Sequence, residues 1–204
     1  NHFPSIFSFF THEIKIIERK INKKNLKRVV SQLAAEGVES IAVSFLHSFA
    51  NPAHEQAVGE YIQKNHPEIY CSLSSEIMPE IREYERTSAT AMNAYVQPIT
   101  HDYLKSLDTK LKDLGFDGII DIMISSGKLT TLEGAIKTPI QLLESGPAGG
   151  TMAGVFFGKL TNNEDLLAFD MGGTTAKICV IDQGKPLIAH EFEVDRIYRF
   201  KILI

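Results

Sequence analysis

The clearest indication of the fold is the stretch LLAFDMGGTTAKI, residues 166–178. Apolar residues at its start predict a buried strand that delivers Asp170 into a turn with two adjacent glycines. Glycines have no Cβ and let backbone N–H groups approach phosphate oxygens, and the two threonines that follow add hydroxyl donors. Asp170 supplies a hard carboxylate of the kind that Mg²⁺ prefers. The alternative is a plain hairpin in which Gly172 and Gly173 serve only to reach positive φ.

A second glycine-rich segment, SGPAGGT at residues 145–151, precedes this stretch. It opens an expected helix, and a helix N-terminus presents N–H groups and the positive end of its dipole to an anion. The segment is not a Walker A loop, because no Gly-Lys-Ser/Thr follows, and the chain has no Gly-x-Gly-x-x-Gly motif. The alternative is that small residues let this helix pack closely on its neighbour. Those residues are Gly149, Gly150, Ala153 and Gly154.

Outward from these segments, helices and strands alternate in the order of an open α/β sheet. Strands are expected at 12–21, at 40–46 and 69–73, and at 119–124, the runs at 40–46 and 119–124 being apolar enough for burial. Helices are expected at 26–34 (ended by Gly37), at 52–65 after Asn51, at 80–114 as one long helix or two helices kinked at Pro98, at 132–136 and from Gly146 onward. The period then changes to two, which predicts strands at 166–169, 176–181 and 187–194.

Composition narrows the classes of partner. Lys and Arg number 21 against 25 Asp and Glu, a formal charge of -4, so the chain lacks the basic footprint of nucleic-acid binding or of an anionic membrane surface. No run approaches the roughly 20 apolar residues that span a bilayer. The two cysteines, Cys71 and Cys179, lie in apolar runs typical of buried free thiols, so a reducing, cytoplasmic location is expected.

An arginine pair and one histidine are further candidate ligand-binding residues. Arg82 and Arg86 are four residues apart on an expected helix and could clamp an anion, but such a run is also typical of a solvated helix face with weak ion pairs. His47 follows an expected parallel strand, where open α/β sheets bind ligands, but it also fits a loop residue. No histidine has metal-ligand spacing to a cysteine or acidic partner, so no zinc site is expected.

Taken together, these runs resemble the hydantoinase A / 5-oxoprolinase / acetone carboxylase β-subunit family over about residues 25–200. The stretches that carry the resemblance, in order, are 37–39 through 46–55, 74–88, 93–96, 143–150 and 169–175. The resemblance implies an α/β fold with an actin-like, sugar-kinase-like (ribonuclease H-like) ATPase architecture of two lobes. Residues 1–78 would end the amino-terminal lobe, and 79–204 would begin the hydantoinase A lobe with its phosphate-loop hairpin.

The resemblance also implies ATP, Mg²⁺ and the opening of a cyclic amide, of hydantoin or 5-oxoproline type, by phosphorylation of a carbonyl oxygen. A ketone-carboxylating subunit and a non-catalytic assembly module remain alternatives. The implied phosphate-binding residues are Asp170, which would also hold the metal, Gly172, Gly173, Thr174, Thr175 and Lys177. A second subunit or domain of hydantoinase B type is the expected partner, with exposed apolar surface near residues 198–204.

Three departures from the family pattern limit this expectation. The family's first phosphate loop and its later glycine-rich nucleotide segment are not in this sequence, so the chain is expected to be an internal piece and a poor enzyme by itself. Many relatives have an acidic residue where this chain has Lys177. That lysine either contacts phosphate or extends from its strand into solvent.

Overall fold

The computed structural model describes residues 20–173 and 175–187 and divides into two compact units, one ending at Ile99 and one beginning at Thr100. This division lies within the long helix α5, Glu83–Asp113. The expected strand at 12–21 lies almost wholly outside the described residues, as does 188–194 of the last expected strand. Over the described ranges, no helix has both the length and the apolar character needed to cross a bilayer.

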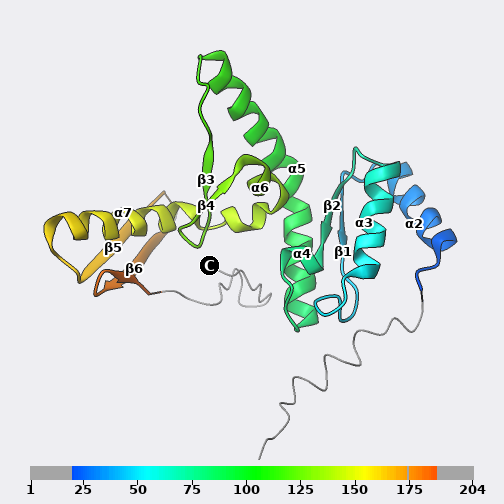
Figure 1. Cartoon of the computed structure of the whole chain (residues 1–204), viewed down its shortest axis with the longest axis horizontal. Coiled ribbons are helices and arrows are strands. Elements are labelled where there is room, and N and C mark those ends of the chain that lie inside the picture. Colours follow the sequence, from blue (N-terminus) through cyan, green and yellow to red (C-terminus); the bar gives the residue numbers. More distant parts are fainter. Residues whose placement is uncertain (1–19, 174, 188–204) are drawn as a thin grey trace, which may run out of the picture. The chain divides into compact units, whose positions relative to one another are not determined.

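The first unit combines a small parallel sheet with helices (Figure 1). Its elements are α2 Lys23–Ala35, β1 Ser40–Val43, α3 Ala53–Asn65, β2 Tyr70–Leu73, the short α4 Ser74–Ile77 and the first part of α5. β1 and β2 are parallel, which confirms the helix–strand alternation. The core lies between the sheet, α2 and α3 and consists of Val30, Val43, Val58, Ile62, Ile69 and Leu73.

The end of α2 shows how local signals set these boundaries. Gly37 adopts φ +76°, a conformation that glycine reaches without a Cβ penalty. The N–H of Gly37 donates to Ala34 O and that of Val38 donates to Leu33 O, the two bonds of a Schellman motif. The predicted helix at 26–34 and its glycine end are therefore confirmed.

The first strand is shorter than expected. β1 ends at Val43 rather than at residue 46, and the side chains of Phe45 and Leu46 are 39% and 80% exposed. The N–H of Phe45 donates to Oε1 of Glu55 at 2.8 Å, so it is not available to a strand ladder. The expectation of a fully buried strand over 40–46 was therefore wrong.

The second unit contains two small antiparallel sheets. Its elements after α5 are β3 Asp121–Met123, β4 Leu129–Thr131, α6 Leu132–Lys137, the 3₁₀ helix η1 Pro139–Leu142, α7 Ser145–Thr161, β5 Leu166–Met171, β6 Ala176–Asp182 and β7 Lys185–Pro186. β4 was not expected, and its partner β3 is partly exposed rather than buried. A small core forms from Leu104, Leu132 and Ala135.

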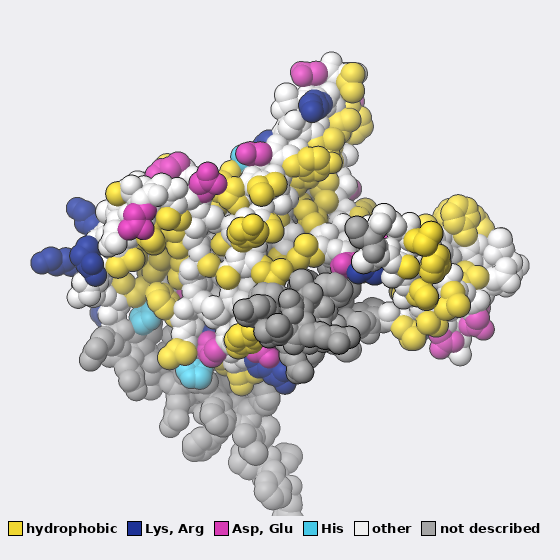
Figure 2. All heavy atoms as spheres, turned by 180° about the vertical axis from the view of Figure 1, so that it is seen from behind, with side chains coloured by type: hydrophobic (Ala, Val, Ile, Leu, Met, Phe, Trp, Pro, Cys, Tyr) yellow, Lys and Arg dark blue, Asp and Glu magenta, His cyan; other side chains and the backbone are white. Residues whose placement is uncertain are grey.

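One face of the β5–β6–β7 sheet packs against α7, and among the residues that the structure describes nothing covers the other face. A Cβ on Gly154 of α7 would lie 3.0 Å from Cδ1 of Ile181 and 3.6 Å from Cβ of Ala168. The opposite face carries exposed apolar side chains, and Figure 2 shows such side chains gathered on this part of the molecule. They are Leu167, Phe169, Met171, Ile178 and Val180. The expected strand at 166–169 is confirmed as the start of β5, but it is half-buried rather than buried, because the described residues cover this antiparallel sheet on the α7 side only.

Candidate functional site

Asp170 and Lys177 lie opposite each other on β5 and β6. Because side chains alternate along a strand, Asp170 points to the same side of the sheet as Ala168, the side that faces α7. Lys177 shares that side as the register partner of Asp170. Beyond them the chain turns, and the N–H of Gly172 donates to Thr175 O at 3.0 Å. Thr174, predicted as a hydroxyl donor, lies outside the described residues.

The two glycines of this turn are not required by backbone conformation. Neither Gly172 nor Gly173 has φ in the left-handed region. A Cβ added to either would meet no heavy atom of the described residues within 4 Å. The alternative in which the glycines serve only positive φ was therefore wrong. The turn presents exposed backbone with open space above it, which suits the close approach of a ligand.

Helix α7 brings the second glycine-rich segment to the same place. Its N-cap is Glu144, in the left-handed region at φ +64°, with no side-chain capping hydrogen bond. A Cβ on Gly146 or Gly150 would meet nothing within 4 Å among the described residues, whereas one on Gly149 would meet Sδ of Met123 at 3.1 Å. Close packing therefore explains Gly149 and Gly154, but not Gly146 or Gly150.

The two segments line one polar cavity of about 290 Å³. Its walls are Leu142, Glu144, Ser145, Gly146, Pro147, Asp170, Gly172, Thr175 and Lys177. In the first turn of α7, Pro147 has no N–H and the N–H of Ala148 donates to Glu144 O at 3.2 Å. The N–H groups of Ser145 and Gly146, two residues that line this cavity, are the ones without a partner within the helix. Sequence reasoning treated the two segments separately and did not predict that they meet.

A larger cavity of about 580 Å³ adjoins the polar one and shares five of its lining residues with it. The shared residues are Glu144, Gly146, Pro147, Asp170 and Lys177. The remaining wall includes the loop at 125–128 and the side chains of Met152, Cys179 and Leu187. A volume in this range holds the organic part of a small ligand.

An ion pair crosses the junction of the two cavities. Nζ of Lys177 lies 2.8 Å from Oε1 of Glu144, and the two side chains are 34% and 27% exposed. In the structure Lys177 thus pairs with a carboxylate of the chain, a partner that neither of its two expected roles included. Glu144 was missed by sequence reasoning, although its place directly before the glycine-rich start of α7 was a signal that could have identified it.

The donor set fits a phosphate group with a metal held mainly by that phosphate and by water. Lys177, Thr175 and the backbone N–H groups supply the donors, and Asp170 supplies one exposed carboxylate. Among the described residues, no group of three or more His, Cys, Asp or Glu could hold a metal ion. Most ligands of a Mg²⁺ ion here would thus come from the bound phosphates and solvent.

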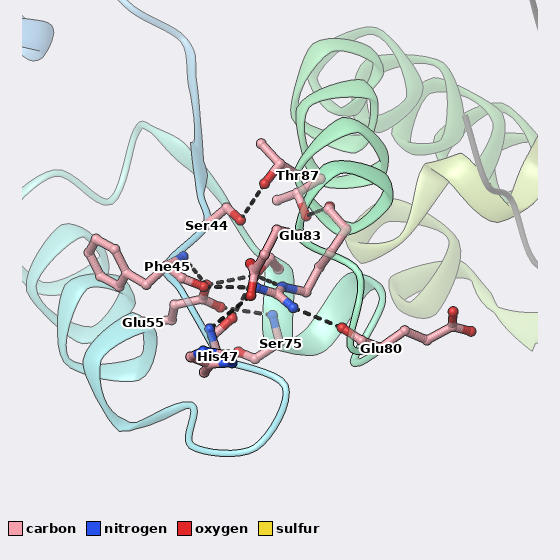
Figure 3. Close-up of polar contacts among 12 residues, drawn as sticks. Ser44, Phe45, His47, Glu55, Ser75, Glu80, Glu83 and Thr87 are labelled. Carbon is pink, nitrogen blue, oxygen red and sulfur yellow. Dashed lines mark hydrogen bonds and ion pairs between the residues drawn. The ribbon is translucent and has the colours of Figure 1, made fainter. Parts of the chain in front are cut away.

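The arginine pair in the first unit has a different role from either expectation. Arg82 precedes α5 and is exposed, whereas Arg86 is fully buried. The guanidinium of Arg86 donates to the carbonyl oxygens of Phe45 and Glu80, both at 2.8 Å, and pairs with Glu83 (Figure 3). The anion clamp was therefore wrong, because each guanidinium nitrogen of Arg86 has a partner within the chain. The solvated position with a weak ion pair holds for Arg82 alone, whose Nη1 lies 3.5 Å from Oε1 of Glu85.

Glu55 completes this buried cluster. Its Oε1 accepts from Oγ of Ser74 at 2.6 Å and its Oε2 accepts from the N–H of Ser75 at 2.8 Å. Burial raises the pKa of Glu55, but these hydrogen bonds and the one from Phe45 outweigh it and lower the pKa. His47 is a loop residue whose N–H donates to Glu83 at 3.0 Å, as its alternative interpretation predicted (Figure 3). The cluster joins the loop after β1 to α3, α4 and α5 and is structural.

Comparison with known proteins relates this chain to one family. The family profile described as hydantoinase/oxoprolinase matches residues 86–202, and the profile of the hydantoinase/oxoprolinase N-terminal region matches residues 11–66. An uncharacterized protein of Methanocaldococcus jannaschii is 40% identical over 85% of this chain and 26% of its own length. The 5-oxoprolinase of Saccharomyces cerevisiae is 33% identical over 89% of this chain and 14% of its own length.

A caprolactamase subunit alpha of Pseudomonas jessenii is 27% identical over 81% of this chain and 24% of its own length. The chain thus spans about a quarter or less of these relatives. A nucleotide-free structure of acetone carboxylase matches with a TM-score of 0.70 at 23% identity, over 89% of this chain and 26% of that one. The expected α/β fold of actin-like ATPase type is thereby confirmed, and the chain belongs to the hydantoinase/oxoprolinase family.

Proposed function

We propose that this chain carries a phosphate-binding site of an ATP-dependent enzyme that opens a cyclic amide of the hydantoin or 5-oxoproline type. The observation that carries the proposal is the convergence of the α7 N-terminus and the Gly172-Gly173 turn on one polar cavity. Relatives named 5-oxoprolinase and caprolactamase support a cyclic-amide substrate. The proposed ligands are ATP and Mg²⁺, and the proposed location is cytoplasmic.

The residues of the site would neutralise the charge of the bound phosphates and hold them in position. Asp170 would hold the metal, directly or through water, and Lys177 would place its ammonium against phosphate oxygens. The backbone N–H of Gly173, together with Thr174 and Thr175, would fix the phosphate chain. Gly172, whose own N–H donates to Thr175 O, would leave room for the phosphate because it has no Cβ. When bound, MgATP supplies the phosphoryl group that makes the amide carbonyl oxygen a leaving group. The sequence 79–204 would thus contribute the phosphate hairpin to its lobe, with 1–78 in the preceding lobe.

Carboxylation of a ketone is the second candidate. A beta subunit of acetone carboxylase from Xanthobacter autotrophicus is 26% identical over 81% of this chain, and the structural match is also to an acetone carboxylase. The same phosphate site would serve there, because an enolate oxygen can accept a phosphoryl group as a carbonyl oxygen does. The alternatives differ in the organic acceptor and not in the residues around Asp170.

A partner subunit or domain of hydantoinase B type is also proposed. Relatives named caprolactamase subunit alpha and acetone carboxylase beta subunit are parts of assemblies by their names. The apolar surface expected near residues 198–204 lies outside the described residues, so it stays a prediction.

Calorimetric titration of the chain with MgATP tests the phosphate site. Asp170→Asn should weaken binding by at least about tenfold, roughly 1.4 kcal/mol, because it removes the carboxylate that would hold the metal beside the turn. The matched control is Asp117→Asn, since Asp117 is an exposed aspartate of the same unit that lines neither cavity. Equal affinity for the two variants, or no binding by the unsubstituted chain, would contradict the proposal.

A further inference from the structure

We propose that Glu144 is a specificity-determining residue that competes with the bound anion for Lys177 and thereby lowers the affinity of the site for phosphate groups. This inference rests on the proposed function, because it assigns the anion to the cavity beside Lys177. It concerns a residue outside the turn and outside the glycine-rich segment that the sequence singled out.

Lys177 and Glu144 form a close ion pair. Nζ of Lys177 and Oε1 of Glu144 are 2.8 Å apart, and the two residues are separated by 33 positions in the chain. Both side chains are about one-third exposed or less, so solvent screens their attraction less than that of a fully exposed pair. The ammonium is therefore held by a carboxylate where the proposed function needs it to face phosphate.

Glu144 lies at the junction of the two cavities. Glu144 lines both cavities, as do Asp170 and Lys177, so the pair lies where a ligand passing from one cavity to the other would meet it. Its backbone has φ +64°, which is unfavourable for a residue with a Cβ and readily adopted by glycine. Glu144 is therefore a non-glycine residue at a position whose backbone conformation favours glycine. Its ion pair with Lys177 gives it a role there.

The consequence follows from the charges that face the cavity. An anion beside Lys177 meets two carboxylates, Glu144 and Asp170, and only one of them, Asp170, has a metal-binding role in the proposed function. In the absence of Mg²⁺ the anion must displace Glu144 from Lys177 or share the ammonium with it. Neutralising Glu144 should therefore tighten binding of a metal-free anion, by about three- to tenfold. A merely structural role predicts the opposite, because losing the ion pair would loosen the site.

The test is calorimetric titration of the full chain with inorganic tripolyphosphate in the absence of divalent metal. The variants are Glu144→Gln, Lys177→Met and the double variant, and the matched control is Glu133→Gln, an exposed glutamate in the same unit that lines neither cavity. The inference expects tighter binding by Glu144→Gln alone and no gain when Lys177→Met is also present. Circular dichroism of each variant checks that the fold is retained.

The outcomes separate this inference from the proposed function. If Glu144→Gln binds no more tightly than the unsubstituted chain, or if the gain persists without Lys177, the competition is overturned. The MgATP titration with Asp170→Asn then still decides the phosphate site independently. If no variant binds tripolyphosphate or MgATP, both proposals fail. A gain with Glu144→Gln combined with no effect of Asp170→Asn would retain the competition and overturn the metal role of Asp170.

Discussion

Glu55 is a fully buried carboxylate whose oxygens accept three hydrogen bonds, from the N–H groups of Phe45 and Ser75 and from Oγ of Ser74. Glu55→Gln keeps the shape but points an amide NH₂ at donors. We expect it to lower the free energy of unfolding by about 2 kcal/mol, because buried donors lose their acceptor. Urea unfolding measures the change. Glu60→Gln, on an exposed residue of the same helix, should change the stability little.

The lowered pKa of Glu55 also fixes a pH dependence. A carboxylate whose pKa is lower in the folded chain contributes stability above its unfolded pKa of about 4.3, and that contribution is lost as pH falls through the folded pKa. The free-energy difference between the unsubstituted chain and Glu55→Gln should therefore shrink below about pH 4. A difference that is constant from pH 7 to pH 3 would contradict the role of the charge.

At the scale of elements, the glycines of helix α7 are of two kinds: some pack closely against neighbouring residues, and others face open space. A Cβ on Gly158 would lie 2.7 Å from the carbonyl oxygen of Asn163, which belongs to the backbone and cannot turn away. Gly158→Ala should therefore destabilise the chain by about 1–3 kcal/mol. Gly150→Ala, with nothing within 4 Å among the described residues, should stabilise it by about 0.5–1 kcal/mol through helix propensity. Thermal unfolding without ligand compares the two, and equal effects would contradict this assignment.

Elements with local signals were predictable from the sequence. Gly37 ends α2, Asn51 precedes α3, and α5 continues through Pro98 to a left-handed Gly115. Caps and turns of this kind depend on neighbours a few residues away. β3 lies within the strand expected at 119–124, but its partner β4 was missed because it is three residues long, too short for a period to emerge.

The candidate site was predictable only where its signals are local in the sequence. The Gly-Gly turn stands out in the sequence, whereas its meeting with α7 and the pairing of Lys177 with Glu144 depend on contacts distant in sequence. Arg86 shows the same limit. Its charge suggested a surface position, yet partners from the loop after β1, from α4 and from the start of α5 surround it, and it is completely buried. Whether Asp170 to Lys177 bind phosphate remains a prediction.

At the scale of the whole molecule, the two cysteines lie in different units and can report on each separately. Cys71 is on β2 in the first unit and Cys179 is on β6 in the second. Burial, with the charges of Glu76 and Glu55, raises the pKa of Cys71 to about 11. At pH 8 only about one part in a thousand of this thiol is ionised in the folded chain, so its alkylation should depend on opening of the first unit.

Two core substitutions should therefore affect the two thiols differently. Ile62, fully buried in the first unit, and Ile181, 1% exposed in the second, belong to separate units of the structure. Ile62→Ala should cost its unit about 3 kcal/mol and accelerate alkylation of Cys71 far more than that of Cys179, which lines a cavity and reacts without opening of its unit. Ile181→Ala should leave the alkylation rate of Cys71 unchanged. Mass spectrometry of the peptides after timed alkylation measures both rates. Equal acceleration of both thiols by either variant would mean that the units open as one, through the shared helix α5.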